Sequence, residues 1–164
     1  MGNLNGSISW IQYFMGIAKI SALRSKDPVT KVGACIVNES NHVVALGYNG
    51  MPTGCDDELM PWGKGDSNIL QTKHPYVCHA ELNAILNSGG RKLSNAVLFV
   101  TLFPCCECAK AIIQVGIKKV IFDEIKNENK VSILAAKKMF KITGVQLQKY
   151  SEINFNKTVI KIEV

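Results

Sequence analysis

The sequence contains no apolar run that approaches the 18 residues of a membrane-spanning helix, so no transmembrane segment is expected. Its first six residues lack the basic and apolar regions of a secretory signal, and we therefore expect a cytoplasmic protein. Internal repeats and low-complexity stretches are also missing. With 164 residues, of which 47% are hydrophobic and 20% charged, the chain is expected to form one globular domain over residues 1–164.

A basic stripe with interleaved aromatic residues, which is typical of nucleic-acid binding, is missing too. The net charge is +6, but the lysines and arginines are spread along the chain. The densest group, Lys137, Lys138 and Lys141, is interpreted as a solvated helix face. An alternative is that the positive charge attracts a phosphorylated substrate.

Nothing in the sequence indicates secretion, so the six cysteines are expected to be reduced thiols rather than disulfides. Apolar periodicity predicts helices and strands that alternate along most of the chain. The predicted helices cover 7–23, 79–88, 105–115 and 132–143, and the predicted strands cover 32–37, 43–48, 96–103, 117–122 and 145–148, with a further edge strand over 158–164. Residues 55–72 have no clear period and are expected to form a long loop.

The arrangement of these elements predicts the fold class. The first two strands are joined by a short turn and should form an antiparallel hairpin, whereas 96–122 reads as a right-handed, parallel βαβ unit. The sum is an α/β fold with three α/β/α layers and a mixed sheet of about five strands. In the first helix, Ser9 is the expected N-cap, and the expected apolar stripe is Trp10, Phe14, Ile17 and Ile20. In the second helix the expected core face is Leu82, Ile85 and Leu86.

Two short motifs fall at predicted helix starts, His79-Ala80-Glu81 and Pro104-Cys105-Cys106-Glu107-Cys108. One imidazole and two thiols are the ligand set of a catalytic zinc (Zn²⁺) whose fourth position is left for water. Cys105 and Cys108 are one helical turn apart, so their sulfurs can converge on one ion. Glu81 is not needed as a ligand and is expected to carry protons, which is the form of the zinc-deaminase signature.

Other interpretations of these motifs stay open. A closed structural zinc site needs four protein ligands, and Cys106 or Cys78 would have to supply the fourth. A thioredoxin-like redox pair explains the two spaced cysteines but gives His79 and Glu81 no role. Cys106 has the wrong helical phase to join the ligands and is interpreted as a bystander thiol.

Three further segments complete a larger pattern around the two motifs: Arg24-Ser25-Lys26-Asp27-Pro28, Val32-Gly33-Ala34-Cys35-Ile36-Val37 and Gly47-Tyr48-Asn49-Gly50-Met51-Pro52. With Pro75 to Ile85 and Thr101 to Lys110, the chain resembles the deoxycytidylate (dCMP) deaminase family of the cytidine-deaminase-like superfamily. The resemblance covers roughly residues 10 to 122. It implies hydrolytic deamination of dCMP to dUMP, which feeds dTMP synthesis.

The resemblance also implies roles for individual residues. Zinc would be held by His79, Cys105 and Cys108, with Glu81 as proton shuttle. Substrate would be bound by Ser25 and Lys26 near the phosphate, by Asn49 at a sugar hydroxyl, and by Tyr76 and Ala80.

Regulation and assembly follow from the same resemblance. Family members are commonly homo-hexamers or other homo-oligomers, activated by dCTP and inhibited by dTTP, with magnesium (Mg²⁺) on the triphosphate. The effector contacts would come from Gly47, Tyr48, Gly50 and Met51. Two other functions remain open: a base deaminase acting on tRNA or single-stranded DNA, and a non-catalytic zinc module that binds nucleotides.

Overall fold

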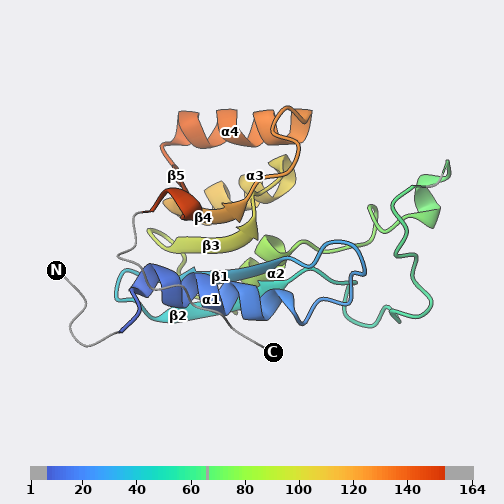
Figure 1. The fold of residues 1–164 in the computed structure, drawn as a ribbon, viewed down its shortest axis with the longest axis horizontal. Helices are drawn as coiled ribbons and strands as arrows, with labels where there is room; N and C mark the ends of the chain where they lie inside the picture. Colours follow the sequence, from blue (N-terminus) through green and yellow to red (C-terminus); the bar gives the residue numbers. More distant parts are fainter. Residues whose placement is uncertain (1–6, 66, 154–164) are drawn as a thin grey trace.

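The computed structural model describes residues 7–65 and 67–153, which contain a five-stranded sheet. The sheet is packed between helices (Figure 1). The helices are α1 (Trp10–Ala22), α2 (Ala80–Asn87), α3 (Cys106–Gln114) and α4 (Val131–Thr143). The strands are β1 (Gly33–Val37), β2 (Val43–Tyr48), β3 (Val97–Leu102), β4 (Lys119–Glu124) and β5 (Gln146–Lys149). A short 3₁₀ helix, η2 (Ile69–Gln71), lies between β2 and α2, and another, η3 (Tyr150–Glu152), follows β5.

The sheet is mixed, as the sequence predicted. Its strand order is β2-β1-β3-β4-β5, with β1 antiparallel to both of its neighbours and β3, β4 and β5 parallel. The predicted β1–β2 hairpin and the parallel β3–α3–β4 unit are therefore confirmed. The predicted edge strand over 158–164 lies outside the described residues.

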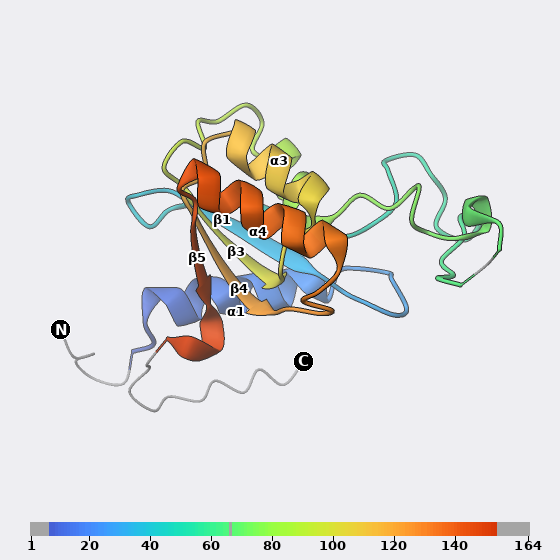
Figure 2. The same ribbon diagram turned by 90° about the horizontal axis from the view of Figure 1, so that it is seen from above.

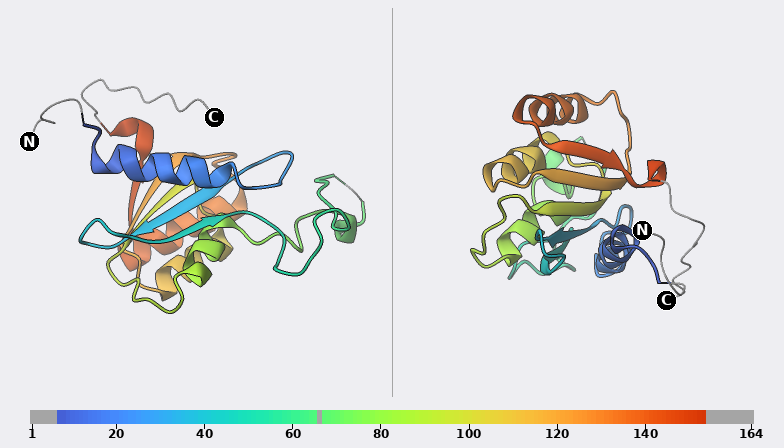
Figure 3. Two further views of the ribbon diagram at one scale, coloured as in Figure 1. Left: turned by 90° about the horizontal axis from the view of Figure 1, so that it is seen from below. Right: turned by 90° about the vertical axis from the view of Figure 1, so that its left-hand side faces the viewer.

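Helices cover both faces of the sheet, which confirms the three-layer prediction. Helix α1 lies on one face, and α2, α3 and α4 lie on the other (Figures 2 and 3). Two hydrophobic cores lie on the two faces of the sheet. Alternate residues of β1 pack into each core, because successive side chains of a strand point to opposite faces. Ala34 and Ile36 belong to the core under α2–α4, and Cys35 and Val37 belong to the core under α1.

The apolar stripe predicted for α1 is partly wrong. Phe14 is buried, but Trp10 and Ile20 are 58% and 49% exposed. Ser9 caps the helix as predicted and forms a capping box with Gln12. The buried residues of the helix are Gln12, Phe14, Met15, Ala18, Ser21 and Ala22.

Close backbone contact explains which face of α1 is buried. A Cβ atom on Gly33 would lie 2.0 Å from the carbonyl oxygen of Ala18 and 2.4 Å from the nitrogen of Ala22. The helix therefore rests directly on β1 at Gly33, and the helix residues at this contact are Ala18 and Ala22. The larger apolar residues Trp10 and Ile20 are turned away from this contact.

Helix α2 rests on β2 in the same way. A Cβ atom on Gly47 would lie 2.2 Å from the oxygen of Ala80 and 2.4 Å from the nitrogen of Ala84. The buried face of α2 is accordingly Ala80, Glu81 and Ala84. Leu86, which the sequence placed in the core, is 65% exposed, so that prediction is wrong.

The long loop predicted before α2 is confirmed, apart from η2. The chain between β2 and α2 extends well away from the sheet and returns to it, which Figures 1 and 2 show. Thr72 and Lys73 are buried at the returning end, amid exposed neighbours. Within the described ranges, no helix is both long and apolar enough to cross a membrane.

We predict that Gly33→Ala lowers the free energy of unfolding by about 2–4 kcal/mol, because the new methyl group would overlap the backbone of α1. Gly65→Ala is the matched control, since a Cβ atom there meets nothing within 4 Å, and it should change stability by less than about 0.5 kcal/mol. Urea unfolding of the zinc-loaded proteins measures both. Equal stabilities for the two variants would contradict the packing described for Gly33.

Candidate metal centre and active-site cavity

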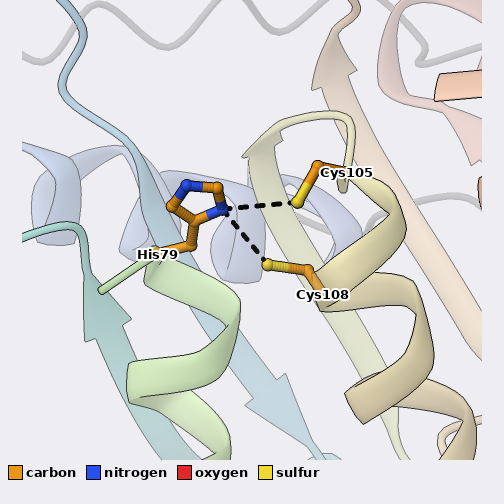
Figure 4. A group of neighbouring side chains, drawn as sticks. All are labelled: His79, Cys105 and Cys108. Atoms are coloured by element: carbon orange, nitrogen blue, oxygen red, sulfur yellow. Dashed lines mark hydrogen bonds between the residues drawn. The ribbon is translucent and has the colours of Figure 1, made fainter. Parts of the chain in front are cut away.

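The two sequence motifs meet because each begins a helix at the same end of the sheet. His79 is the N-cap residue of α2, and Cys105 is the N-cap residue of α3. Neither side chain caps its own helix, so both are free to point across the gap between the helices. Cys108 follows one turn into α3, and Figure 4 shows the three side chains converging.

The distances between these side chains fit a tetrahedral metal ion. The Nδ1 atom of His79 lies 3.5 Å from the Sγ atom of Cys105 and 3.4 Å from that of Cys108. Zinc bonds of 2.0–2.1 Å to nitrogen and about 2.3 Å to sulfur place tetrahedral ligands about 3.5 Å apart. The imidazole and the two thiols therefore fit zinc in both kind and spacing.

Three protein ligands, rather than four, make up this cluster. The potential ligand atoms of His79, Cys105 and Cys108 all lie within 4.8 Å of one another, and no other His, Cys, Asp or Glu of the described ranges joins them. Cys106 lies instead near the carboxylate of Glu107, with 3.7 Å between its sulfur and Oε1. An open fourth position is the arrangement of catalytic rather than structural zinc sites.

Hydrogen bonds among the three ligands shift their pKa values in different directions. The hydrogen bond with Cys108 lowers the pKa of the Cys105 thiol to about 3 and raises the pKa of Cys108. The contact with Cys105 also raises the pKa of His79. A metal ion must displace protons from Cys108 and His79, so metal affinity is expected to fall as the pH falls.

Glu81 lies beside the metal ligands but outside their cluster. It is in the first turn of α2, only 4% exposed, and its side chain lines a cavity. Burial raises the pKa of its carboxyl group, while the nearby His79 acts in the opposite direction. A buried carboxyl group beside the metal ligands can serve as the group that takes up and releases a proton.

The cavity has a volume of about 270 Å³. It is lined by the two motifs and by residues from four other parts of the chain, 27–32, 49, 64–77 and 126–133. The metal ligands His79 and Cys105 are on its wall together with Glu81. The polar and charged residues that complete the lining are Asp27, Thr30, Asn49, Lys64, Lys73, His74, Lys126, Asn127, Lys130 and Ser132.

Two of the substrate contacts implied by the resemblance, Asn49 and Ala80, line this cavity. Backbone hydrogen bonds of 3.0 and 2.8 Å pair Gly50 with Cys78 and bring the end of β2 beside the metal-binding segment. The hydroxyl of Tyr76, which is outside the lining, donates to the backbone oxygen of Leu70 at 3.2 Å.

Ser25 and Lys26 are not part of the cavity lining. Ser25 is buried and donates its hydroxyl hydrogen to the backbone oxygen of Asn49 at 2.8 Å. The amine of Lys26 is at the surface, where it pairs with Asp57 at 2.6 Å. Their predicted contact with a phosphate stays a prediction.

The four effector candidates, Gly47, Tyr48, Gly50 and Met51, are also outside the lining of this cavity. The structure gives Gly47 a packing role against α2, and Gly50 its pairing with Cys78. Tyr48 is 38% exposed at the edge of the sheet. Their predicted role in effector binding is not tested by this geometry.

Sequence reasoning missed the cationic part of the cavity. Lys126 and Lys130 follow the parallel strand β4. Ligands of α/β sheets commonly bind beyond the carboxyl ends of parallel strands, so the position of these lysines in the sequence could have indicated that they line a ligand site. Lys64 comes from the long loop and donates to the hydroxyl of Thr30 at 3.1 Å. Nothing in its local sequence indicates that it returns to the cavity.

With this geometry in view, comparison with known proteins identifies the family. Residues 8–124 match the cytidine and deoxycytidylate deaminase zinc-binding region. The chain belongs to the cytidine and deoxycytidylate deaminase family. Within this family it is 50% identical to deoxycytidylate deaminase of Mus musculus over 95% of this chain and 87% of that protein. It is 51% identical to the Homo sapiens deoxycytidylate deaminase, over 87% and 80% of the two chains.

A solved deaminase structure supports the assignment of the fold. The dCMP deaminase of cyanophage S-TIM5, in complex with dCMP and dUMP, superposes with a TM-score of 0.68 at 28% identity. The match covers 84% of this chain and 94% of that one. The mixed sheet and its helices are therefore those of a cytidine-deaminase-like α/β fold.

We predict that Cys105→Ser and Cys108→Ser each weaken zinc binding at least about 100-fold, because a serine hydroxyl cannot replace a thiolate ligand. Cys106→Ser is the matched control and should bind one zinc ion per chain. Zinc content after dialysis against a competing chelator measures all three. Loss of zinc from the Cys106 variant would show that the fourth position is occupied by protein.

Proposed function

We propose that this protein catalyses the hydrolytic deamination of dCMP, in which water and dCMP give dUMP and ammonia for dTMP synthesis. The observation that carries the proposal is the open His79, Cys105 and Cys108 cluster beside a buried carboxyl group in a cavity with a cationic wall. Relatives about 50% identical to this chain bear the name deoxycytidylate deaminase, which supports dCMP as the substrate.

His79, Cys105 and Cys108 would hold the zinc ion. Zinc bound there supplies a Lewis acid that lowers the pKa of a coordinated water from 15.7 to about 7. Glu81 would take a proton from the attacking water at a carboxylate oxygen and pass it to the ring nitrogen as the water oxygen bonds to the ring carbon that bears the amine. It would then take the proton of the new hydroxyl group and pass it to the amine as the C–N bond breaks, which gives dUMP and ammonia, so Glu81 acts as both base and acid.

The base and sugar would be held by two residues of the cavity wall, Asn49 and Ala80. Asn49 presents its amide to a sugar hydroxyl, and Ala80 flanks the base at the start of α2. Tyr76 is outside the cavity lining, and its hydroxyl contact with Leu70 would support the loop before α2 rather than meet the base.

The phosphate would be bound by the cationic part of the cavity wall. Lys126 and Lys130 have no carboxylate within ion-pair distance among the described residues, so both amines are available. Lys130 is the N-cap residue of α4, and the first N–H groups of a helix also favour a phosphate. Ser25 and Lys26 would contribute through the loop that shapes this wall.

We further propose the regulation and assembly that the family resemblance implies. In this view dCTP with Mg²⁺ activates and dTTP inhibits a homo-oligomer, commonly a hexamer, of single-domain chains (residues 1–164) in the cytosol. The pairing of Gly50 with Cys78 supports the effector role of residues 47–51, because it joins this loop directly to the segment that carries His79. Dependence of the dCMP saturation curve on added dCTP would test it.

The substrate is tested by assaying ammonia release from dCMP, deoxycytidine and a single-stranded oligonucleotide with zinc-loaded protein. We expect dCMP to be the preferred substrate, and Glu81→Gln to lower its turnover at least about 1,000-fold while retaining zinc, because only proton transfer is lost. Turnover of the oligonucleotide with dCMP inert would identify a polynucleotide deaminase. Zinc binding without any turnover would identify a non-catalytic module.

We predict that Lys130→Met raises the KM for dCMP by about tenfold or more and leaves kcat/KM for deoxycytidine unchanged, because the lost charge contacts only the phosphate. Lys138→Met is the matched control, since Lys138 is exposed on the same helix and does not line the cavity. Steady-state kinetics on both substrates provides the test. Equal losses on dCMP and deoxycytidine would place the phosphate elsewhere.

A further inference from the structure

We propose that Asp27 is a positioning residue that fixes the orientation of the Asn49 amide, so that the protein selects a sugar carrying a hydrogen-bond donor, the 3′-hydroxyl. The inference rests on the proposed function, because it concerns the sugar of the same nucleotide. It assigns a role to a buried carboxylate that takes no part in the proton transfers described for Glu81.

Asp27 is the centre of a buried hydrogen-bond network. Its side chain is 1% exposed, and Oδ1 accepts the backbone N–H groups of Val29 and Thr30 at 2.8 and 3.0 Å. Oδ2 accepts from the amide of Asn49 at 3.2 Å and from the amine of Lys73, which is itself buried. The carboxylate is therefore held in place from three separate parts of the chain.

This network keeps Asp27 in the charged, accepting form. Burial acts to raise the pKa of its carboxyl group, but the hydrogen bonds from Lys73 and from the backbone of Thr30 and Val29 outweigh burial and hold the pKa below its usual value. At neutral pH the oxygen that faces Asn49 is therefore an acceptor and carries no proton.

Only one orientation of the Asn49 amide satisfies its neighbours. Its Oδ1 atom accepts the backbone N–H of Val32 at 2.7 Å. Its Nδ2 atom donates one hydrogen to Asp27 and the other to the backbone oxygen of Thr30, at 3.2 and 2.9 Å. A flipped amide would place its nitrogen against the Val32 N–H and its oxygen against two acceptors, so the flip is excluded.

The fixed orientation decides what Asn49 can offer a ligand in the cavity. Both hydrogens of Nδ2 are already used, and only the second lone pair of Oδ1 remains. A group that binds Asn49 must therefore donate a hydrogen bond. A 3′-hydroxyl does so, whereas a hydrogen or a fluorine atom at the 3′ position cannot. A site built around such a hydrogen bond rejects analogues that lack the donor, because its own acceptor is then left unpaired.

The first test uses zinc-loaded wild-type protein and three nucleotides: dCMP, 2′,3′-dideoxycytidine monophosphate and its 3′-fluoro analogue. We expect kcat/KM to fall at least about 100-fold for the dideoxy compound. The 3′-fluoro compound should be equally poor, because fluorine accepts but does not donate. A 3′-fluoro compound turned over as well as dCMP would overturn the inference. Turnover of none of the three would instead overturn the proposed function.

The second test removes Asp27 without leaving a buried charge unpaired. In Asp27→Asn with Lys73→Met, an amide nitrogen replaces the oxygen that holds Asn49, and no buried ammonium remains without a partner. We expect the ratio of kcat/KM for dCMP over the dideoxy compound to fall at least about tenfold. Phosphate contacts are common to both substrates and cancel in this ratio.

Lys73→Met alone is the matched control for this ratio. It removes one contact that keeps Asp27 ionised but leaves the backbone donors of Val29 and Thr30 on Oδ1 and Asn49 on Oδ2, so the ratio should stay within about threefold of the wild-type value. An unchanged ratio in the double variant, or an equal fall in the single variant, would show that Asp27 has no role of its own. If the double variant does not fold, the 3′-fluoro comparison in the wild type still tests the fixed orientation of the Asn49 amide, and a 3′-fluoro compound turned over as well as dCMP would overturn it.

Discussion

The convergence of two helix N-termini at one end of the sheet is the constraint on which the rest of the structure depends. Helix α2 begins at His79 and α3 begins at Cys105, so the imidazole and the thiols point into the same space. Gly47 allows α2 to rest directly on β2, and this contact fixes where His79 lies relative to the end of that strand. The sheet therefore holds the metal ligands at the spacing that zinc requires.

A second constraint shapes the part of the cavity wall that Asp27, Asn49 and Lys73 form. Loops that are far apart in the sequence are held together there by buried polar contacts, with Asp27 joined to both Asn49 and Lys73. Each buried group of this network has its hydrogen-bond partners, and no buried side-chain nitrogen or oxygen of the described residues lacks one. Such a network keeps a cavity in one shape, because each rearrangement would leave a polar group unpaired.

Much of the fold and the metal centre could be predicted from the sequence because their signals are local. Cys105 and Cys108 are separated by one helical turn, and apolar periodicity marks most of the helices and strands. The buried face of α1 was mispredicted at Ile20 because Gly33, on a different element, contacts the helix backbone at Ala18 and Ala22, and Ile20 lies on the other side of the helix. The pairing of Lys73 with Asp27 depends on tertiary structure, and no spacing in the sequence encodes it.

The central claim is that one zinc ion is held by one nitrogen and two sulfur ligands of this chain with a fourth position open. X-ray absorption at the zinc edge of the purified protein tests it most directly. The account predicts two sulfur atoms at about 2.3 Å and two lighter atoms, nitrogen and oxygen, at about 2.0–2.1 Å. Three or four sulfur ligands, or a protein that deaminates without bound zinc, would contradict it.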